Sequence, residues 1–341
     1  MDCGSKERQF AQDLKKLIIL ACLLLISIGL ILYARQIKNK LFDTIQVVSP
    51  SSDQRTVEKP QALTLISTGD IGLVRDINYQ IQQRHDPNYP FVNIADYLKN
   101  ADLTLTNLEG PLIKNCPIVL TGFNFCGKDT NVSGLVFAGI DAASLANNHA
   151  TNFGLSSLTQ TSSILMVNGI TPFGLADEIE YTEILDKKIA LVGFVELGNN
   201  WTGLNNTTTQ NIVKLVSEAK SNADIVITAF HWGVEYTHKP TTNQIQLAHL
   251  AIDSGADLVL GNHPHWIQEN EVYKDVFISY AQGNTIFDQD WSQKTKEGII
   301  YKFQYQNGKF RKIDEKYTII ENNTQPRFAT DEETIKIKSR F

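Results

Sequence analysis

The sequence predicts an α/β domain with a largely buried sheet, and three observations support this. Apolar strand-like runs alternate with helical patterns over residues 62–328. Four of these runs end in a residue type that binds metals, which is expected where the carboxyl ends of strands meet. With 341 residues, 42% hydrophobic and 20% charged, the chain is long enough and apolar enough for one large core or two modest ones.

The first element in the chain is an apolar segment at residues 17–34. Its 18 residues, LIILACLLLISIGLILYA, carry no charge, and at a rise of about 1.5 Å per residue they cover most of a bilayer core. Basic residues lie on both sides, with a small bias toward a cytoplasmic N-terminus at residues 1–16. A cleaved signal peptide is the alternative, but Tyr33-Ala34-Arg35 is a poor cleavage site. We therefore expect a single transmembrane anchor in the cell membrane and an extracytoplasmic body.

Residues 35–61 are expected to form a linker, because the stretch from Ser49 to Pro60 is polar and has Ser and Pro at its ends. The folded domain is expected over residues 62–328, and residues 329–341 are expected to form a flexible, charged tail. The domain has two cysteines, Cys116 and Cys126, in a loop with Pro and Gly. They either close a small disulfide outside the cytoplasm or remain as free buried thiols, and the sequence leaves both alternatives open.

The order of elements in the domain follows from the local patterns. Helices are expected at residues 211–221 and 242–253, and the alternation around Asn307-Gly308 in residues 297–320 predicts a β-hairpin at the edge of the sheet. Strands are expected near residues 63–68, 103–107, 134–138, 188–194, 223–230, 256–260 and 276–281.

Metal-ligand residues follow four of the expected strands. Asp70 follows the first, Asn107 and Glu109 follow the second, His231 ends a later strand, and His263 and His265 follow another. Carboxylate, imidazole and amide oxygen together suit Mn, Fe or Zn. Such a set can hold one or two divalent ions that activate a water molecule for hydrolysis. A surface turn can carry two histidines by chance, but agreement among four strand ends argues against that alternative.

Asn148 and His149 close the run Ser144 to His149. The amide of Asn148 is placed to reach a metal, and His149 would then be free to donate a proton to a leaving group. The alternative for Asn147 and Asn148 alone is a capped turn. Glu235, near His231, is a candidate to orient an imidazole. Three other histidines, His85, His238 and His249, are expected to lie at the surface or to be satisfied by neighbours.

The formal net charge is -6, and acidic and basic residues are interspersed along the chain. No basic stripe that would follow a phosphate backbone is present in the sequence, so nucleic acid is not an expected partner.

Six ordered motifs resemble those of the CapA-like family, the poly-gamma-glutamate capsule synthesis proteins with a calcineurin-like metallophosphoesterase fold. The resemblance covers roughly residues 62–290. The motifs are Ser67-Thr68-Gly69-Asp70, Asn107 to Leu112, Ser144 to His149, His231 to Tyr236, Gly261 to His265, and Gly283 to Gln289.

The resemblance implies an αββα four-layer sandwich with a metal site at one rim, tethered to the membrane and working in assembly or export of an anionic capsule polymer. It implies His149 as the acid. The wider superfamily begins its motifs with Asp-x-His, but here Asp70 is followed by Ile71 and Gly72, so one metal position lacks a usual ligand. Transferred position by position, the implied metal ligands are Asp70, Glu109, Asn148, His231, His263 and His265.

Two functions remain open at this stage. The first is a membrane-anchored, metal-dependent hydrolase acting on phosphoesters or on polymer linkages. The second is a non-catalytic, metal-containing subunit that binds an anionic polymer beside synthase subunits, which the ligand missing after Asp70 keeps open.

Overall fold

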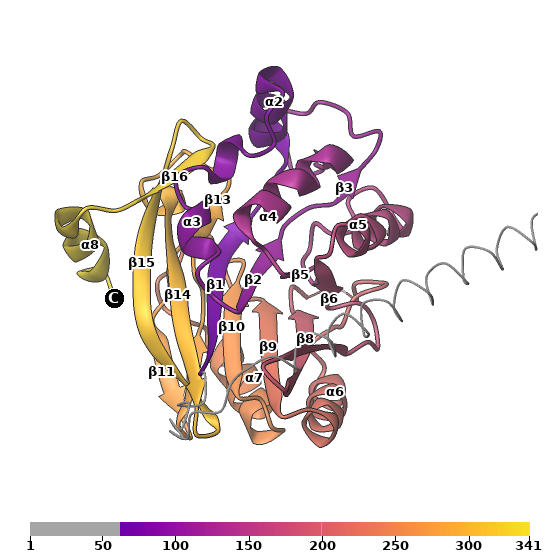
Figure 1. Ribbon diagram of the computed structural model, residues 1–341, viewed down its shortest axis with the longest axis vertical. Helices are drawn as coiled ribbons and strands as arrows, with labels where there is room; N and C mark the ends of the chain where they lie inside the picture. The colour runs from indigo at the N-terminus through magenta and orange to yellow at the C-terminus, as the bar shows by residue number, and fades with distance from the viewer. Residues whose placement is uncertain (1–61, 199) are drawn as a thin grey trace, which may run out of the picture. The chain divides into compact units, whose positions relative to one another are not determined.

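The computed structural model describes residues 62–198 and 200–341 (Figure 1). The predicted anchor at 17–34 and linker at 35–61 lie outside the described residues. Within the described ranges, no helix has the length and apolar character needed to cross a bilayer.

The first sheet has eight strands, and its central strands β1, β2, β5 and β6 run parallel. The order is β16-β15-β14-β1-β2-β5-β6, and β13 pairs with the carboxyl end of β1. The strands are β1 (Leu63–Ile71), β2 (Leu103–Leu108), β5 (Ala142–Ser144), β6 (Thr171–Phe173), β13 (Asn284–Ile286), β14 (Glu297–Gln306), β15 (Lys309–Glu321) and β16 (Gln325–Phe328).

The second sheet has six strands in the order β11-β12-β10-β9-β8-β7. Its parallel centre is formed by β8, β9, β10 and β12. The strands are β7 (Glu180–Ile184), β8 (Lys187–Val195), β9 (Ile225–His231), β10 (Leu258–Asn262), β11 (Asn270–Tyr273) and β12 (Val276–Ser279). A separate short pair joins β3 (Leu112–Ile113) to β4 (Gly127–Lys128).

Helices cover the outer face of each sheet (Figure 1). The first sheet is covered by α2 (Arg75–Arg84), α3 (Ala95–Leu98), α4 (Val132–Ala138) and α5 (Leu155–Val167), and the second by α6 (Thr209–Asn222) and α7 (Thr242–Asp253). Three short 3-10 turns lie at Tyr89–Phe91, Asp129–Asn131 and Lys294–Lys296, and α8 (Asp331–Lys338) follows β16.

The main apolar core lies between the two sheets. Leu65 of β1 and Leu105 of β2 belong to the same buried cluster as Ile227 of β9 and Leu260 of β10. Ile66, the next residue of β1, belongs instead to the cluster beneath α2 to α5, because successive side chains of a strand point to opposite faces. The layers therefore run helix, sheet, sheet, helix, in agreement with the αββα prediction.

The hairpin predicted at Asn307-Gly308 is present between β14 and β15. Both turn residues have positive φ (55° and 79°), as a tight two-residue hairpin requires. The hairpin pairs with β1 on one side and with the short β16 on the other, so β16 is the edge strand.

The strand expected at residues 134–138 is wrong, because this segment belongs to helix α4. Val132, Leu135 and Ala138 are buried while Val136 is 47% exposed, which is a helical and not an alternating pattern. Gly139, with φ 73°, ends the helix in the left-handed conformation that glycine adopts readily.

The flexible tail expected at residues 329–341 is also wrong, since α8 forms within it. Thr330 and Glu333 make a capping box, three acidic residues lie in the first turn, and lysines lie in the last. Ile337 is buried, and Arg340 pairs with Glu297 at the start of β14. The expectation rested on the charged composition of the segment, but the capping box and the buried side chain of Ile337 are enough to stabilise a helix there.

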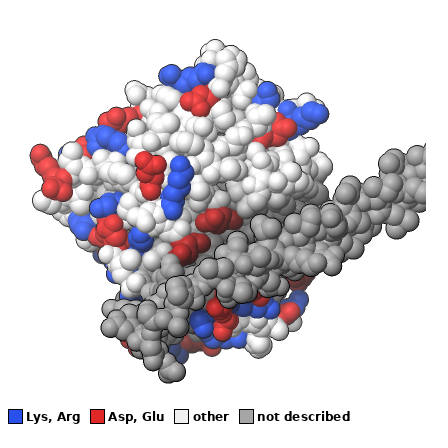
Figure 2. Space-filling model, viewed as in Figure 1, with Lys and Arg blue, Asp and Glu red and all other residues white. Residues whose placement is uncertain are grey.

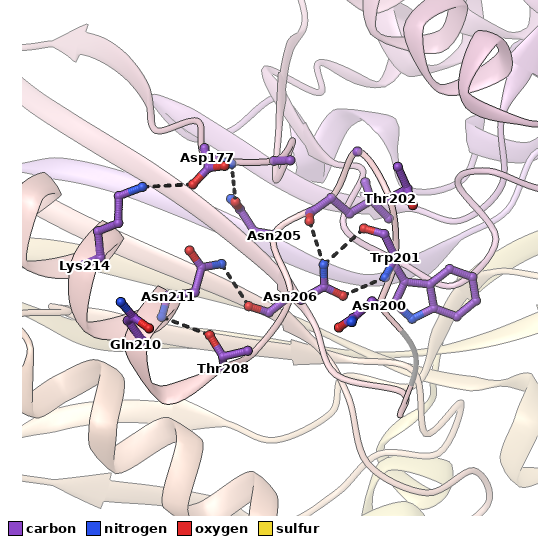
Figure 3. Close-up of a pocket in the computed structure, with 13 residues that line it drawn as sticks. Asp177, Asn200, Trp201, Thr202, Asn205, Asn206, Thr208, Gln210, Asn211 and Lys214 are labelled. Carbon is purple, nitrogen blue, oxygen red and sulfur yellow. Dashed lines mark hydrogen bonds and ion pairs between the residues drawn. The ribbon is translucent and has the colours of Figure 1, made fainter.

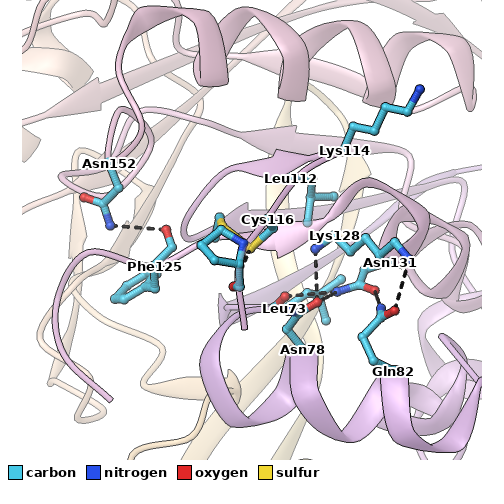
Figure 4. Close-up of a disulfide and its surroundings, with 12 residues drawn as sticks. Leu73, Asn78, Gln82, Leu112, Lys114, Cys116, Phe125, Lys128, Asn131 and Asn152 are labelled. Atoms are coloured by element: carbon cyan, nitrogen blue, oxygen red, sulfur yellow. Dashed lines mark hydrogen bonds between the residues drawn. A yellow bond between two sulfur atoms is a disulfide. The ribbon is translucent and has the colours of Figure 1, made fainter. Parts of the chain in front are cut away.

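Cys116 and Cys126 form a disulfide (Figure 4). Of the two alternatives that the sequence leaves open, the structure therefore has the bonded pair. The bond closes a loop whose apolar side chains Ile118, Leu120 and Phe123 are exposed.

Candidate metal centre

The predicted ligands meet where strands of both sheets end. Asp70 lies near the end of β1 and Glu109 follows β2, while His231 ends β9, and His263 and His265 follow β10. All five are at most 5% exposed. Gly69 allows β1 to pack closely against the backbone of Gly283, because a Cβ at position 69 would lie 2.2 Å from the carbonyl oxygen of Gly283.

Asp70 is held by a chain of amides. Asn107 Nδ2 donates to Asp70 Oδ1 at 2.7 Å, and Asn147 Nδ2 donates to Asn107 Oδ1 at 3.2 Å. Asp70 Oδ2 then faces the backbone N–H of His263 at 3.3 Å and His265 Nδ1 at 3.4 Å. Asn107 thus orients the carboxylate of Asp70, and Asn147 supports Asn107.

The tautomer of His265 follows from its neighbour Asn284. The amide nitrogen of Asn284 donates to Thr295 O at 2.8 Å and to Gln289 Oε1 at 3.2 Å, so its oxygen faces His265 Nδ1 at 2.9 Å. In the neutral imidazole of His265, Nδ1 therefore carries the proton and Nε2 has the lone pair that an ion would need. Nε2 lies 3.7 Å from Glu109 Oε1. Metal-binding histidines commonly donate their second N–H in this way.

Asn148 meets His231 across the two sheets. Its Oδ1 lies 3.0 Å from His231 Nε2, about the separation of two ligands at right angles on bonds of ~2.1 Å. The rings of His231 and His263 are 4.8 Å apart between centroids. The structure thus brings all six predicted ligands together.

The buried polar atoms at this rim fit a divalent metal ion. Both carboxylate oxygens of Glu109, together with Nδ1 of His231 and Nδ1 of His263, are buried without a hydrogen-bond partner. A buried carboxylate left unpaired is costly, and a cation satisfies it. The possible ligand atoms form two groups, and within each group the atoms lie within 4.8 Å of one another. The first group is Asp70, Glu109 and His231, and the second is Glu235, His263 and His265.

Burial dominates the electrostatics of the centre. It raises the pKa of Glu109, lowers the pKa of His263 to about 3, and lowers the pKa of His231 well below its ordinary value. For His265, burial acts to lower the pKa, but the carboxylates of Glu109 and Asp70 outweigh it and raise the pKa. Neutral His231 and His263 offer lone pairs to a cation, and a bound cation would favour ionised Glu109.

His149 lies at the edge of the centre, with its side chain 14% exposed and Nε2 3.9 Å from Glu109 Oε1. Its ring stacks on Phe125 at 4.3 Å. Asn152 Nδ2 donates to Phe123 O at 3.0 Å, so the same amide group also presents a hydrogen to His149 Nδ1 at 3.1 Å. His149 Nδ1 therefore accepts, and its Nε2–H faces the metal ligands. Burial lowers the pKa of His149 to about 4.

Other residues singled out in the sequence lie in structural roles. His249 pairs with Glu271 at 2.8 Å, and His238 Nδ1 lies 2.8 Å from Ile267 O. Trp232 is buried in the apolar cluster beneath α6 and α7, and its Nε1 donates to Tyr280 O at 2.8 Å. Asp288 is bound by Arg75, whose Nε donates to its Oδ1 at 2.9 Å.

Sequence reasoning missed four contributors to the site. Glu235 is expected only to orient an imidazole, yet it belongs to one of the two ligand groups. Asn152 and Arg75, whose guanidinium lies 4.7 Å from the centre of the Phe125 ring that stacks on His149, stand in no motif. Asn284 lies within the last motif but carries no signal of its contact with His265.

The departure from Asp-x-His has a physical counterpart at Gly72. A Cβ at this position would lie 2.6 Å from the ring of Phe287. The ring of Phe287 in turn lies 5.0 Å from that of His265. Phe287 therefore fills the space into which a histidine at position 72 would extend.

A hollow of about 500 Å³ beside α6 lies apart from the metal ligands (Figure 3). The side-chain amides of Asn205, Asn206 and Asn211 all form hydrogen bonds with backbone groups of nearby residues. Lys214 pairs with Asp177 at 2.9 Å. The polar groups of this hollow are largely used in holding the loop that forms it, and none of the predicted site residues lines it.

Two sheets between helical layers, with carboxylates and imidazoles gathered at the strand ends, define a mixed α/β protein with a four-layer αββα fold. A crystal structure of a hypothetical protein from Thermus thermophilus superposes with a TM-score of 0.50 at 13% identity, covering 75% of this chain and 98% of that one. A novel phosphatase from Mycoplasma pneumoniae gives 0.50 at 12% identity, covering 82% and 98%. At these identities the likeness shows the fold alone.

The chain belongs to the family described as bacterial capsule synthesis protein PGA_cap, whose profile matches residues 64–289. Capsule biosynthesis protein CapA of Bacillus anthracis is 30% identical over 264 residues, which are 71% of this chain and 64% of the relative. PGA biosynthesis protein CapA of Bacillus subtilis is 28% identical over 256 residues, 70% of this chain and 67% of the relative. The match thus spans just under two thirds of the B. anthracis protein.

Proposed function

We propose that this protein is a membrane-anchored, metal-dependent hydrolase that works in capsule polymer biosynthesis. The observation that carries the proposal is Glu109, whose two carboxylate oxygens are buried without hydrogen-bond partners beside the buried imidazoles of His231, His263 and His265. Such a cluster is expensive for a folded protein unless it holds a cation. The ligand set suits one or two ions of Mn, Fe or Zn.

The chemistry follows from the ligands and from His149. A divalent ion at the centre would supply a Lewis acid that lowers the pKa of a water molecule and stabilises charge on a phosphoryl or similar group. The residues that would hold it are Asp70, Glu109, Asn148, His231, His263 and His265. His149 presents its Nε2–H toward the same space, where the neutral imidazole would donate a hydrogen bond that stabilises charge on the leaving oxygen. Asn107 and Asn284 fix Asp70 and His265, so the geometry is set before substrate binds.

The biological setting rests on the relatives and on the sequence. The names of the Bacillus relatives refer to capsule and PGA biosynthesis, which supports a polymer of the poly-gamma-glutamate type as substrate or partner, together with its synthase subunits. Residues 17–34 would anchor the chain with the body outside the cytoplasm. The Cys116–Cys126 disulfide supports this location, because disulfides persist in oxidising compartments.

A non-catalytic, metal-containing subunit that binds an anionic polymer is the second candidate. The ring of Phe287 in the place of the missing Asp-x-His ligand favours it, because it removes one position of a two-metal hydrolase. The two candidates differ in their need for His149. A hydrolase loses its function in His149→Ala, whereas a binding subunit tolerates that change and fails only when metal ligands are removed.

The test is metal content and phosphodiesterase activity of the full chain purified in detergent, with bis(4-nitrophenyl) phosphate as substrate and Mn, Fe or Zn supplied. One or two equivalents of metal, with hydrolysis lost in His231→Ala and in His263→Ala, would support the hydrolase. His249→Ala is the matched control, because His249 pairs with Glu271 outside the centre. Metal without turnover would favour the binding subunit, and no metal would overturn both. A C-terminal alkaline phosphatase fusion that is inactive in cells would contradict the extracytoplasmic location.

A further inference from the structure

Glu235 is carried to the metal centre by the loop that follows β9. Two backbone hydrogen bonds fasten this loop to the end of β10 and the residues that follow it. Trp232 N donates to Asn262 O at 3.2 Å, and Tyr236 N donates to Pro264 O at 2.8 Å. Gly233 and Tyr236 have positive φ values of 85° and 64°, so the chain turns sharply on both sides of Glu235. The loop is therefore fixed to the backbone that carries His263 and His265.

The side chain of Glu235 reaches those two histidines. One carboxylate oxygen of Glu235 and one nitrogen each of His263 and His265 lie within 4.8 Å of one another. His263 Nδ1 is buried without a partner, and His265 Nε2 is free because Asn284 holds Nδ1. Glu235 is only half-buried while both histidines are buried. One ligand atom from each of the three residues is thus close enough to the others to share an ion, and the partial exposure of Glu235 leaves water access on its side, as a metal position that exchanges water requires.

We propose that Glu235 is a metal ligand and that, with His263 and His265, it holds a second divalent ion beside the one held by Asp70, Glu109 and His231. The inference rests on the proposed metal centre and adds to it a site and a ligand. It gives the first position two carboxylates and one imidazole, and the second position one carboxylate and two imidazoles.

The proposal accounts for the change at Gly72. A ligand projecting from the end of β1 is excluded, because the ring of Phe287 occupies the space that its Cβ would enter. The loop after β9 supplies a carboxylate instead. The two positions are adjacent, since His265 Nε2 of the second group lies 3.7 Å from Glu109 Oε1 of the first. A glutamate in place of a histidine also adds negative charge, which compensates the second divalent ion.

The experiment measures bound metal in the full chain purified in detergent, stripped with chelator and reloaded with Mn²⁺. The variants are Glu235→Gln, which keeps the size of the side chain, and Glu269→Gln, a matched control that is exposed and belongs to neither ligand group. We expect two equivalents in the wild type and in Glu269→Gln, and one in Glu235→Gln. The electron paramagnetic resonance spectrum should change from that of a coupled Mn pair to that of single Mn ions. Circular dichroism before reloading establishes that each variant is folded.

The outcomes separate this inference from the proposed function. Two equivalents retained in Glu235→Gln, or both lost, would overturn the assignment of Glu235 to a second position. A single equivalent in the wild type, unchanged in Glu235→Gln, would overturn it as well and leave a one-metal hydrolase standing. No metal in the wild type would overturn the metal centre itself.

Discussion

At the scale of single residues, the centre depends on amides that bind no metal themselves. Asn284 is the clearest case, because its amide nitrogen is committed to Thr295 O and Gln289 Oε1 and its oxygen must then face His265. The direction of one amide thereby decides which nitrogen of His265 is free to bind an ion. Asn107 acts in the same way on Asp70.

Replacing Asn284 by leucine should weaken metal binding. The change removes the acceptor for His265 Nδ1–H while keeping the size of the side chain, and loss of such a partner typically costs ~10- to 100-fold in metal affinity. Asn284→Asp is the matched variant, because its carboxylate still accepts from Nδ1–H and should retain most of the affinity. Competition of the loaded protein with a chelator measures both. Equal affinities in the leucine and aspartate variants would show that Asn284 does not orient His265.

Metal affinity should rise with pH between pH 6 and pH 9. The pKa values of Glu109 and His265 are both raised, so each holds a proton over part of this range when no ion is bound. An ion must displace those protons, and fewer remain as the pH increases. His231 and His263, whose pKa values are lowered, are already neutral and contribute no dependence. Titration calorimetry should show about a tenfold gain per pH unit for each proton released. A flat profile would contradict this.

Which residues could be predicted depends on where their signal resides. Five predicted ligands lie at or just after the end of a strand, so the order of elements along the chain was enough to propose that they meet. They are Asp70, Glu109, His231, His263 and His265. Glu235 and Asn152 reach the centre through loops fastened by tertiary contacts, from Tyr236 N to Pro264 O and from Asn152 to Phe123 O. Such contacts leave no spacing pattern in the sequence, and the roles of the predicted ligands themselves stay predictions until metal is measured.

At the scale of elements, the loop closed by Cys116 and Cys126 forms the wall beside His149. Phe125 stacks on the ring of His149, and the carbonyl oxygen of Phe123 accepts from Asn152 at 3.0 Å. The carbonyl oxygen of Phe125 accepts from the same amide at 3.4 Å (Figure 4). Arg75 also holds the loop by donating to Gly122 O at 3.1 Å, but residues 120–124 are exposed. The disulfide is therefore part of what keeps His149 oriented.

Breaking this disulfide should lower turnover without releasing metal. In the double variant Cys116→Ser and Cys126→Ser, the loop gains freedom and Asn152 loses its acceptors, while every proposed ligand keeps its place. A displacement of about 1 Å at a reacting group can cost ~10²-fold in rate, so we expect kcat on bis(4-nitrophenyl) phosphate to fall at least about tenfold with metal content unchanged. Asn152→Ala should reproduce the loss. Full activity in both variants would show that the loop plays no part in orienting His149.

Among the elements, those with a clear apolar period or turn signal were predicted, whereas helices α2 and α5 were not expected from the sequence. Helix α7 has the bounds expected from its apolar periodicity, and the turn at Asn307-Gly308 fixed the hairpin. The sequence predicts a strand in place of helix α4 because Leu135, Val136 and Phe137 are individually common in strands, although burial at i, i+3 and i+6 makes the segment helical. Helix α8 was missed because a capping box depends on two residues, Thr330 and Glu333, within a charged segment.

At the scale of the whole molecule, charge limits how a polyanion can bind. The net charge is -6, and on the face shown in Figure 2 lysine and arginine are interspersed with aspartate and glutamate. A basic surface that would attract a polyanion over a long range is absent from that face of the described residues, and a net negative protein repels such a chain. We therefore expect the attraction that the proposed function needs to come from ions bound at the centre.

Removal of metal should therefore abolish binding of poly-gamma-glutamate to the full chain. We expect binding, measured by co-sedimentation with the protein in detergent, to be lost with EDTA, restored by Mn²⁺, and lost in His231→Ala, because the polymer carboxylates would bind the ions directly. Raising the NaCl concentration should weaken it far less than it would weaken binding to exposed lysines, since contacts to a bound ion in a buried centre are poorly screened. Binding that survives EDTA but disappears in salt would place the polymer on the protein surface, and the metal centre would then serve hydrolysis alone.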